Sequence, residues 1–221
     1  MKRTTVTIYV LWSAVTFALA FMTSGLNEDN LVRIMLAGFL LLQFMTYPLL
    51  VRLSKVLKPQ LTFFVLALTF AAVVEGFHMM LRPVFGSLKI SMSMGVAEMF
   101  RNYGIDLAFT LPVYLIVFAV IWWFIRRYRY EWWEYMLVMA AGQALGDGAF
   151  FFLSAPLMLL MIPYVMINYH AMNLVPFLLA RDASGGNRSI LRFVVPVLLV
   201  GIYLICGAAI ALVGKTFFGM V

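Results

Sequence analysis

Residues 73–83 read Val-Val-Glu-Gly-Phe-His-Met-Met-Leu-Arg-Pro, and they close a long apolar segment that begins near residue 60. In a helix with 3.6 residues per turn, Glu75, His78 and Arg82 lie along one face. Ionisable groups are costly at membrane depth, and they usually face the interior of a helix bundle or a wet cavity. This stretch therefore predicts a membrane helix and a polar site inside a bundle.

The composition of the whole chain predicts a helical membrane protein. Of 221 residues, 65% are hydrophobic and 11% are charged, and apolar runs near the ~20 residues that cross a bilayer recur along the chain. The net charge of +7 comes from short basic blocks between these runs. Such blocks set membrane orientation, so we expect no nucleic-acid partner. The lone Cys206 excludes an intrachain disulfide and a cysteine metal cluster.

We predict an all-α polytopic membrane protein that forms a single domain, residues 1–221, with seven transmembrane helices. The expected spans are residues 5–24, 31–52, 60–82, 105–126, 132–154, 157–180 and 190–214. Almost no polar linker separates the fifth and sixth spans, and Ser154-Ala155-Pro156 is the proposed hinge between them. A single bent or re-entrant element is the alternative there. Residues 83–104 are expected to form an outer connection with a short amphipathic helix on the membrane surface.

The basic residues predict the orientation. Most of the 16 Lys and Arg residues fall on one side if the N-terminus is cytoplasmic, which favours a cytoplasmic N-terminus and an extracytoplasmic C-terminus in the cell (inner or plasma) membrane. The first segment resembles a signal peptide around Ala18-Leu19-Ala20. Its apolar run continues beyond that point, so we expect an uncleaved first helix.

Acidic residues from three spans are expected at a similar depth near the outer side. A rise of ~1.5 Å per residue places Glu75 at ~22 Å and Asp147 at ~20 Å from the cytoplasmic face of a ~30 Å core. Asp106 begins the fourth span. We predict a ligand-binding site formed by Glu75, His78, Arg82, Asp106, Gln143 and Asp147. The structural alternative is that Arg82 or His78 merely compensates an acid and fixes the helix register.

A second polar site and a metal site are further hypotheses. His170 and Asn173 share a face of the sixth span, although interhelical hydrogen bonding explains them equally well. A mononuclear metal site of Glu75, His78 and Asp147 stays open, because Glu-x-x-His places two ligands on one helical face. Their different depths disfavour haem between His78 and His170, and the outer methionines are better explained by packing than by Cu(I). The cofactor therefore stays unknown.

Two classes of function remain open from the sequence. The first is a small transporter or permease-like protein whose outward-facing polar cavity binds a cation, a proton or a small polar solute. The alternative is a membrane-embedded hydrolase or transferase, metal-dependent or not, that acts on a lipid-like or peptide substrate at the outer leaflet. In that enzyme Glu75 or Asp147 would be the general base, and His78 a metal ligand or proton shuttle. A third class is an accessory subunit of a larger complex.

The expected partners are the lipid bilayer and a small solute, ion or lipid-like substrate. Gly142 and Gly146 form a small-xxx-small face, which lets another helix approach closely. This face could serve packing within the chain or the assembly of a homo- or hetero-oligomer.

Overall fold

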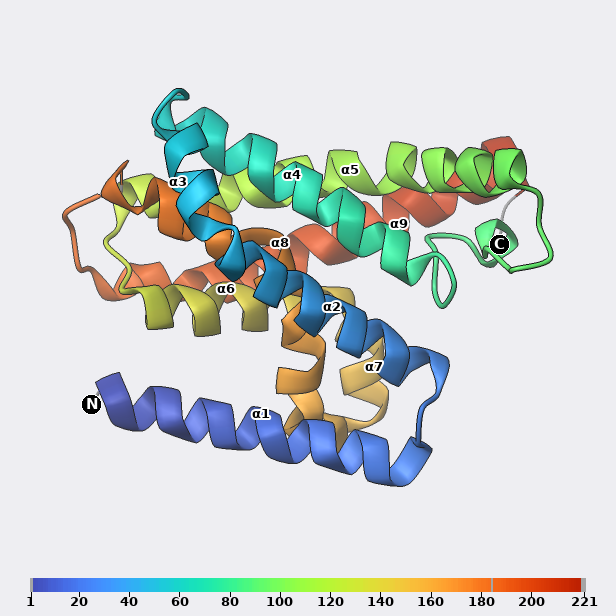
Figure 1. The fold of residues 1–221 in the computed structure, drawn as a ribbon, viewed down its shortest axis with the longest axis horizontal. Helices are drawn as coiled ribbons and strands as arrows, with labels where there is room; N and C mark the ends of the chain where they lie inside the picture. Colours follow the sequence, from blue (N-terminus) through green and yellow to red (C-terminus); the bar gives the residue numbers. More distant parts are fainter. Residues whose placement is uncertain (1, 184, 220–221) are drawn as a thin grey trace.

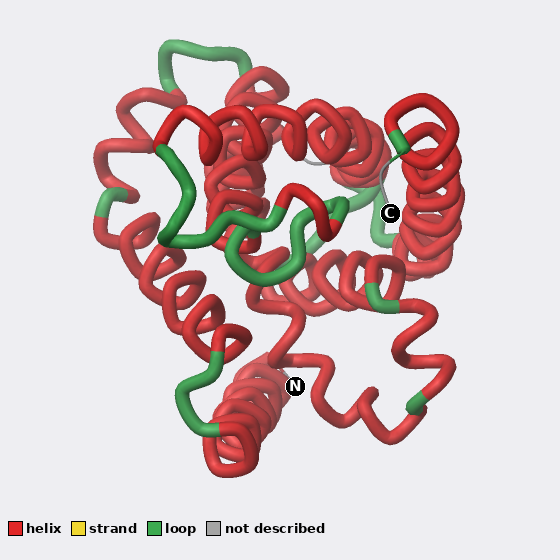
Figure 2. The backbone as a smooth tube through the Cα atoms, turned by 90° about the vertical axis from the view of Figure 1, so that its right-hand side faces the viewer, coloured by secondary structure: helices red, strands yellow, loops and turns green. Residues whose placement is uncertain are grey.

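The computed structural model describes residues 2–183 and 185–219, and all its regular elements are helices (Figures 1 and 2). The α-helices are α1 (Lys2–Ser24), α2 (Glu28–Met45), α3 (Tyr47–Ser54), α4 (Pro59–His78), α5 (Val96–Arg127), α6 (Trp132–Asp147), α7 (Ala149–Ser154), α8 (Ile162–Ala180) and α9 (Val195–Phe218). Short 3-10 helices are η1 (Gly86–Leu88), η2 (Pro156–Met161), η3 (Arg181–Ala183) and η4 (Ile190–Val194). The described residues form no strand, as the prediction of an all-α protein requires.

Several helical segments are long and apolar enough to cross a membrane. Five qualify alone, and α2 with α3 makes a sixth if the pair is one span bent by 60°. The five are Arg3–Ser24, Pro59–His78, Val96–Arg127, Pro156–Ala183 and Ile190–Phe218. These helices support a multi-pass membrane protein. The expected fifth span, residues 132–154, is not among them, because the chain divides at Gly148 into the 16-residue α6 and the 6-residue α7.

Two helix breaks have local causes. α2 ends at Met45, and Pro48 lies in the first turn of α3. A proline is tolerated there but cannot continue the preceding helix, since it lacks a backbone N–H and clashes with the turn before it. Pro156 likewise begins η2 after Ala155, whose backbone is not helical. The break at Pro156 was expected, whereas the break after Met45 divides the expected second span, residues 31–52, into α2 and α3.

Helices α6 and α8 are the two arms of a hairpin whose tip is α7 and η2. The start of α6 and the end of α8 lie at the same end of the bundle, where Glu131 before α6 forms an ion pair with Arg181 after α8. At the tip, the indole of Trp12 in α1 donates a hydrogen bond to the carbonyl of Leu160 at 2.7 Å. In Figure 1 the tip crosses the direction of the long helices beside α1. This geometry favours the re-entrant alternative over two straight full spans.

The connection from α4 to α5 differs from the prediction. α5 begins at Val96, so residues 96–104 extend it and do not form a separate surface helix. No proline interrupts this stretch, and Gly104 alone does not stop a helix. The remaining connection folds back on the bundle, where Phe85 and Leu88 are buried with Met79 and pack against α5 and α9. The predicted amphipathic helix on the membrane surface is therefore wrong.

The glycine face of α6 packs against α9 within the chain. A Cβ atom added at Gly142 would lie 2.7 Å from Cα of Pro196, and one added at Gly146 would lie 2.8 Å from the ring of Tyr203. Any larger side chain would force α9 away. The small residues thus serve the close approach of two helices, and this face is not open to a second chain.

A candidate buried polar site between six helices

Six helices contribute polar side chains to one connected group, which we call the polar cluster and which lies mostly inside the bundle. Its members are Arg33 of α2, Glu75 and His78 of α4, Tyr114 of α5, Asp147 of α6, Asn168 and Tyr169 of α8, and Tyr203 of α9. Hydrogen bonds and electrostatic contacts between these helices connect its members. Polar groups rarely gather in an apolar bundle without a function or a compensating partner.

The acidic part of the cluster contains two carboxylates with tyrosine partners. Glu75 is 8% exposed and accepts a hydrogen bond from the hydroxyl of Tyr114. Asp147 accepts one from the hydroxyl of Tyr169 at 2.8 Å, and Tyr203 is in electrostatic range of both carboxylates. Asp147 is exposed at the surface of the bundle, at the C-terminal end of α6. The cluster is therefore not sealed on that side.

The basic part of the cluster centres on Arg33, which is 8% exposed. Its Nη1 donates a hydrogen bond to Oδ1 of Asn168, and its guanidinium lies 5.1 Å from the centre of the Tyr164 ring. Asp147 is in electrostatic range of Arg33. None of the ion pairs found among the described residues includes Arg33, so this buried cation has amide and aromatic partners and only longer-range acids.

Some polar atoms in and around the cluster have no partner among the described residues. They include Nε of Arg33, Nε2 of His78, the hydroxyl of Tyr203 and Oδ2 of Asp106. His78 does interact with Asn168, so its ring has one polar neighbour. Buried polar atoms normally have a partner, and each exception needs an explanation, such as water, an ion or a ligand.

Arg82 lies outside the predicted site. α4 ends at His78, so the helical spacing that aligned Arg82 with Glu75 does not extend that far. The Arg82 side chain is 76% exposed and forms an ion pair with Asp29 at 3.6 Å. The expectation that Arg82 compensates Glu75 is therefore wrong. The buried cation near the acids is Arg33.

Asp106 and Gln143 have other roles. Asp106 is fully buried and accepts a hydrogen bond from the backbone N–H of Val84 at 2.7 Å, which fixes the α4–α5 connection. It remains in electrostatic range of Glu75. Gln143 donates to the carbonyl of Met139 at 3.1 Å and accepts from Asn173 at 3.3 Å. Asp106 thus borders the polar cluster, whereas Gln143 belongs to another network.

His170 and Asn173 do not form one site. The hydroxyl of Tyr9 in α1 lies 2.7 Å from Nε2 of His170, whereas Asn173 accepts a hydrogen bond from Tyr135 of α6 at 3.0 Å. The two side chains of α8 thus contact different helices. This outcome agrees with interhelical hydrogen bonding, the simpler of the two explanations.

Sequence reasoning missed Arg33, Tyr114, Asn168, Tyr169 and Tyr203. Arg33 was counted only as a charge that sets orientation, although it lies within an expected span. A charge inside an apolar segment was the signal that could have identified it. Tyrosines and asparagines in spans carry no comparable signal, because they are common hydrogen-bonding residues in helix packing.

The hypothesis of a metal site is not supported by the donor geometry. The described residues contain no group of three or more His, Cys, Asp and Glu side chains that could hold a metal ion. Glu75, His78 and Asp147 therefore do not form the proposed ligand set.

Comparisons with protein-family models, curated proteins and solved structures found no match. The function must be argued from the site.

Proposed function

We propose that this chain is a small transporter or permease-like protein whose polar cluster binds a cation, either a proton or a small cationic solute. The observation that carries this proposal is the charge balance of the cluster. Glu75 is buried within electrostatic range of Asp106 and Asp147 and has a tyrosine, not a base, as its hydrogen-bond partner. Arg33 is the buried guanidinium near these acids.

An excess of carboxylates in a low-dielectric interior must be neutralised. A buried carboxylate without a counter-ion takes up a proton or binds a cation, since the isolated charge would be too costly. The accessible Asp147 provides the contact with the surroundings, and Glu75 lies deeper. Cation binding that begins at Asp147 and reaches Glu75 would explain both acids and the open hydroxyl of Tyr203.

The proposed topology keeps the N-terminus cytoplasmic and the C-terminus extracytoplasmic. In Figure 1 the start of α1 and the end of α9 lie at opposite ends of the long axis. The α5–α6 and α8–α9 connections lie at the same end as the start of α1. Arg126 and Arg127 at the end of α5 and Arg129 after it lie at the first connection, and Arg181, Arg188 and Arg192 lie in the second. These arginines support a cytoplasmic location. The α6–α8 hairpin enters and leaves on that side, as two spans or one re-entrant element would.

This topology predicts opposite locations for two reporters. A reporter inserted after Gly186 should be cytoplasmic, and one fused after Val221 should be extracytoplasmic, because one span, α9, separates them. Alkaline phosphatase and green fluorescent protein fusions measure this, since each is active on only one side. If the two positions report the same side, α9 does not cross and the topology fails.

Transport by purified protein in vesicles tests the proposed function. Uptake is measured first for protons with an entrapped pH-sensitive dye, then for radiolabelled sodium and choline. We expect wild-type uptake of at least one of these, and we expect Asp147→Asn to lower its rate by about tenfold or more, a loss of ~1.4 kcal/mol. Glu98→Gln is the control, because Glu98 lies on the exposed start of α5 and pairs with Arg101.

The result that contradicts the proposal is equally definite. If folded wild-type protein moves none of the three cations, the transport proposal fails and the membrane-embedded enzyme becomes the better hypothesis. Equal uptake rates for wild type and Asp147→Asn would show that the polar cluster takes no part in transport.

A further inference from the structure

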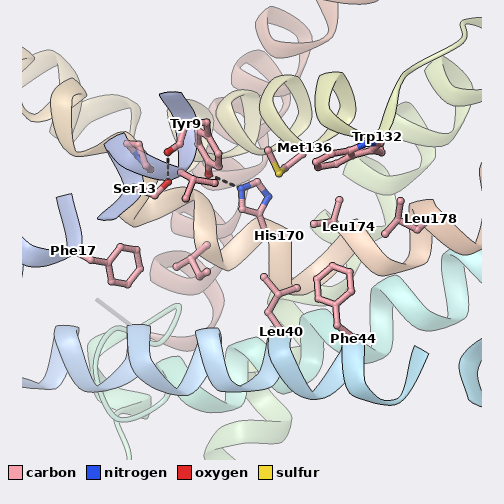
Figure 3. A pocket seen from close by; sticks show the side chains of 13 residues that line it. Tyr9, Ser13, Phe17, Leu40, Phe44, Trp132, Met136, His170, Leu174 and Leu178 are labelled. Atoms are coloured by element: carbon pink, nitrogen blue, oxygen red, sulfur yellow. Dashed lines mark hydrogen bonds between the residues drawn. The ribbon is translucent and has the colours of Figure 1, made fainter. Parts of the chain in front are cut away.

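An apolar groove lies between α1 and the helices α2, α6 and α8, with a volume of about 520 Å³ (Figure 3). Its lining includes Phe17 of α1, Leu40 and Phe44 of α2, Met136 of α6, and Leu174 of α8. Figure 3 shows these side chains pointing toward one another around a shared space. This volume is within the range of ~300–1,000 Å³ that is typical of ligand pockets.

The few polar side chains of the groove are already engaged by the protein. The hydroxyl of Tyr9 contacts Nε2 of His170 at 2.7 Å, and the hydroxyl of Ser13 donates to the carbonyl of Tyr9 at 2.8 Å. None of the buried polar atoms that lack a partner in the described residues lines this groove. A polar ligand would gain little here, so the lining is suited to hydrocarbon.

The position of the groove gives hydrocarbon access to it. α1 is a candidate membrane span, and Tyr9 and Thr16 are its only buried residues in the described chain. Along α8 the lining runs from Pro163 to Leu178, a distance of ~22 Å at 1.5 Å per residue. This is more than half of a ~30 Å bilayer core. One extended lipid chain therefore fits the groove better than a compact molecule.

A polar pocket of about 300 Å³ is lined by residues that are close in the chain to those of the groove. On α8 the groove residues His170, Leu174 and Leu178 follow steps of three or four, and the next step reaches Arg181. On the α6 side, Trp132 lines the groove, and Arg129 lies three residues before it. On both sides, an arginine that lines the polar pocket is thus within three residues of a groove residue.

The charged residues that line the polar pocket are Arg129, Arg181 and Asp182, so arginines outnumber acids in its lining. Glu131 accepts from Arg188 at 2.7 Å and from Arg181 at 3.4 Å, so one carboxylate serves two arginines. Arg129 forms no ion pair with the described residues. Burial raises the pKa of Tyr130, which therefore stays neutral and donates to the carbonyl of Arg192. Arginine binds phosphate groups well because its planar donors match their oxygens.

We propose that the groove and the polar pocket together bind one anionic phospholipid. One hydrocarbon chain lies along the groove between α1 and α8, and the phosphate lies against Arg129 and Arg181. The lipid would fill the space beside α1 and connect this helix to the bundle. This inference does not depend on cation binding in the polar cluster.

Fluorescence quenching by brominated lipids tests this proposal. All tryptophans except Trp132 are replaced by phenylalanine, and the protein is reconstituted with chain-brominated phosphatidylglycerol or phosphatidylcholine. We expect phosphatidylglycerol to bind more tightly near Trp132, with a preference that falls about fivefold for each arginine removed by Arg129→Gln or Arg181→Gln. Arg52→Gln, an exposed arginine of α3, is the control.

A second pair of variants tests the groove itself. Ser13→Phe places a ring in the groove and should reduce quenching by both lipids, whereas Ser24→Phe at the exposed end of α1 should not. Equal quenching by the two lipids, unchanged by the arginine variants, would overturn the headgroup site. Quenching that Ser13→Phe leaves intact would overturn the groove. A Trp132 that neither lipid quenches would indicate that a protein surface covers it and would overturn the whole proposal.

Discussion

Arg33→Gln is expected to reduce the stability of the folded protein more than the replacement of any exposed arginine. Arg33 is buried, and its guanidinium donates to Asn168 and lies over Tyr164. It is also a buried cation in electrostatic range of Asp147. Loss of a hydrogen bond from a charged donor, with a buried amide oxygen left without that donor, typically costs ~1–3 kcal/mol. Thermal unfolding of purified protein in detergent measures this loss.

The matched control is Arg101→Gln. Arg101 is 65% exposed and pairs only with Glu98, three residues away on the same helix. Exposed pairs of this kind contribute at most ~1 kcal/mol. The control should therefore unfold at nearly the wild-type temperature. Equal effects of the two substitutions would show that burial of Arg33 has no energetic consequence.

A double variant distinguishes two reasons why Arg33 stabilises the fold, namely compensation of the Asp147 charge and packing against neighbouring side chains. If Arg33 compensates Asp147, then Arg33→Gln with Asp147→Asn should be more stable than the sum of the two single losses predicts. The coupling arises because no charge remains to be compensated when both groups are neutral. Additive losses would show that Arg33 is held by Asn168 and Tyr164 and not by the acid.

The sequence predicted those parts of the fold that depend on local pattern. α4 was expected at residues 60–82 and occupies Pro59–His78, since its apolar run and Pro59 at the first turn are local signals. The helix class follows from the same apolar periodicity. The ends of the helices were less predictable. α4 ends four residues earlier than expected, and Arg82 therefore lies outside the helix.

The arrangement of the site depends on contacts between distant segments. Glu75 and Asp147 were both recognised as unusual charges, but their tyrosine partners lie 39 and 22 residues away. Neither partner carries a sequence signal, because spacing along one helix does not say which helix packs beside it. Arg33 was missed because positive charge near the end of a span normally reports membrane orientation. Its burial follows from the packing of α2 against α8, which is a tertiary feature.

The path of the α6–α8 hairpin could also be predicted only in part from the sequence. Pro156 predicted the break between the fifth and sixth spans, and η2 begins there. The second break, at Gly148, lies inside the expected fifth span and was not predicted. Composition could not decide between two full spans and a re-entrant turn, because both have similar apolar content. The contact of Leu160 with Trp12 of α1 favours the turn, and this contact joins residues 148 positions apart.

Glu75→Gln is expected to leave the protein folded and to abolish cation uptake. Glutamine retains the shape of the side chain, and its carbonyl can still accept the hydrogen bond of Tyr114. It cannot bind a proton or neutralise a cation. Vesicle uptake should fall to the background rate while the unfolding temperature changes by little. Glu98→Gln, the exposed carboxylate on α5, should retain uptake.

The position of Arg82 gives this prediction a further test. Arg82 pairs with Asp29 at the surface, so it has no charge relation to Glu75 that a second substitution could restore. Glu75→Gln with Arg82→Gln should therefore be as inactive as Glu75→Gln alone. A double variant with wild-type uptake would mean that the two charges compensate each other after all, and that Glu75 is part of the scaffold. If both variants fail to fold, the carboxylate itself stabilises the bundle, and the excess negative charge proposed for the polar cluster would have to be neutralised by Arg33.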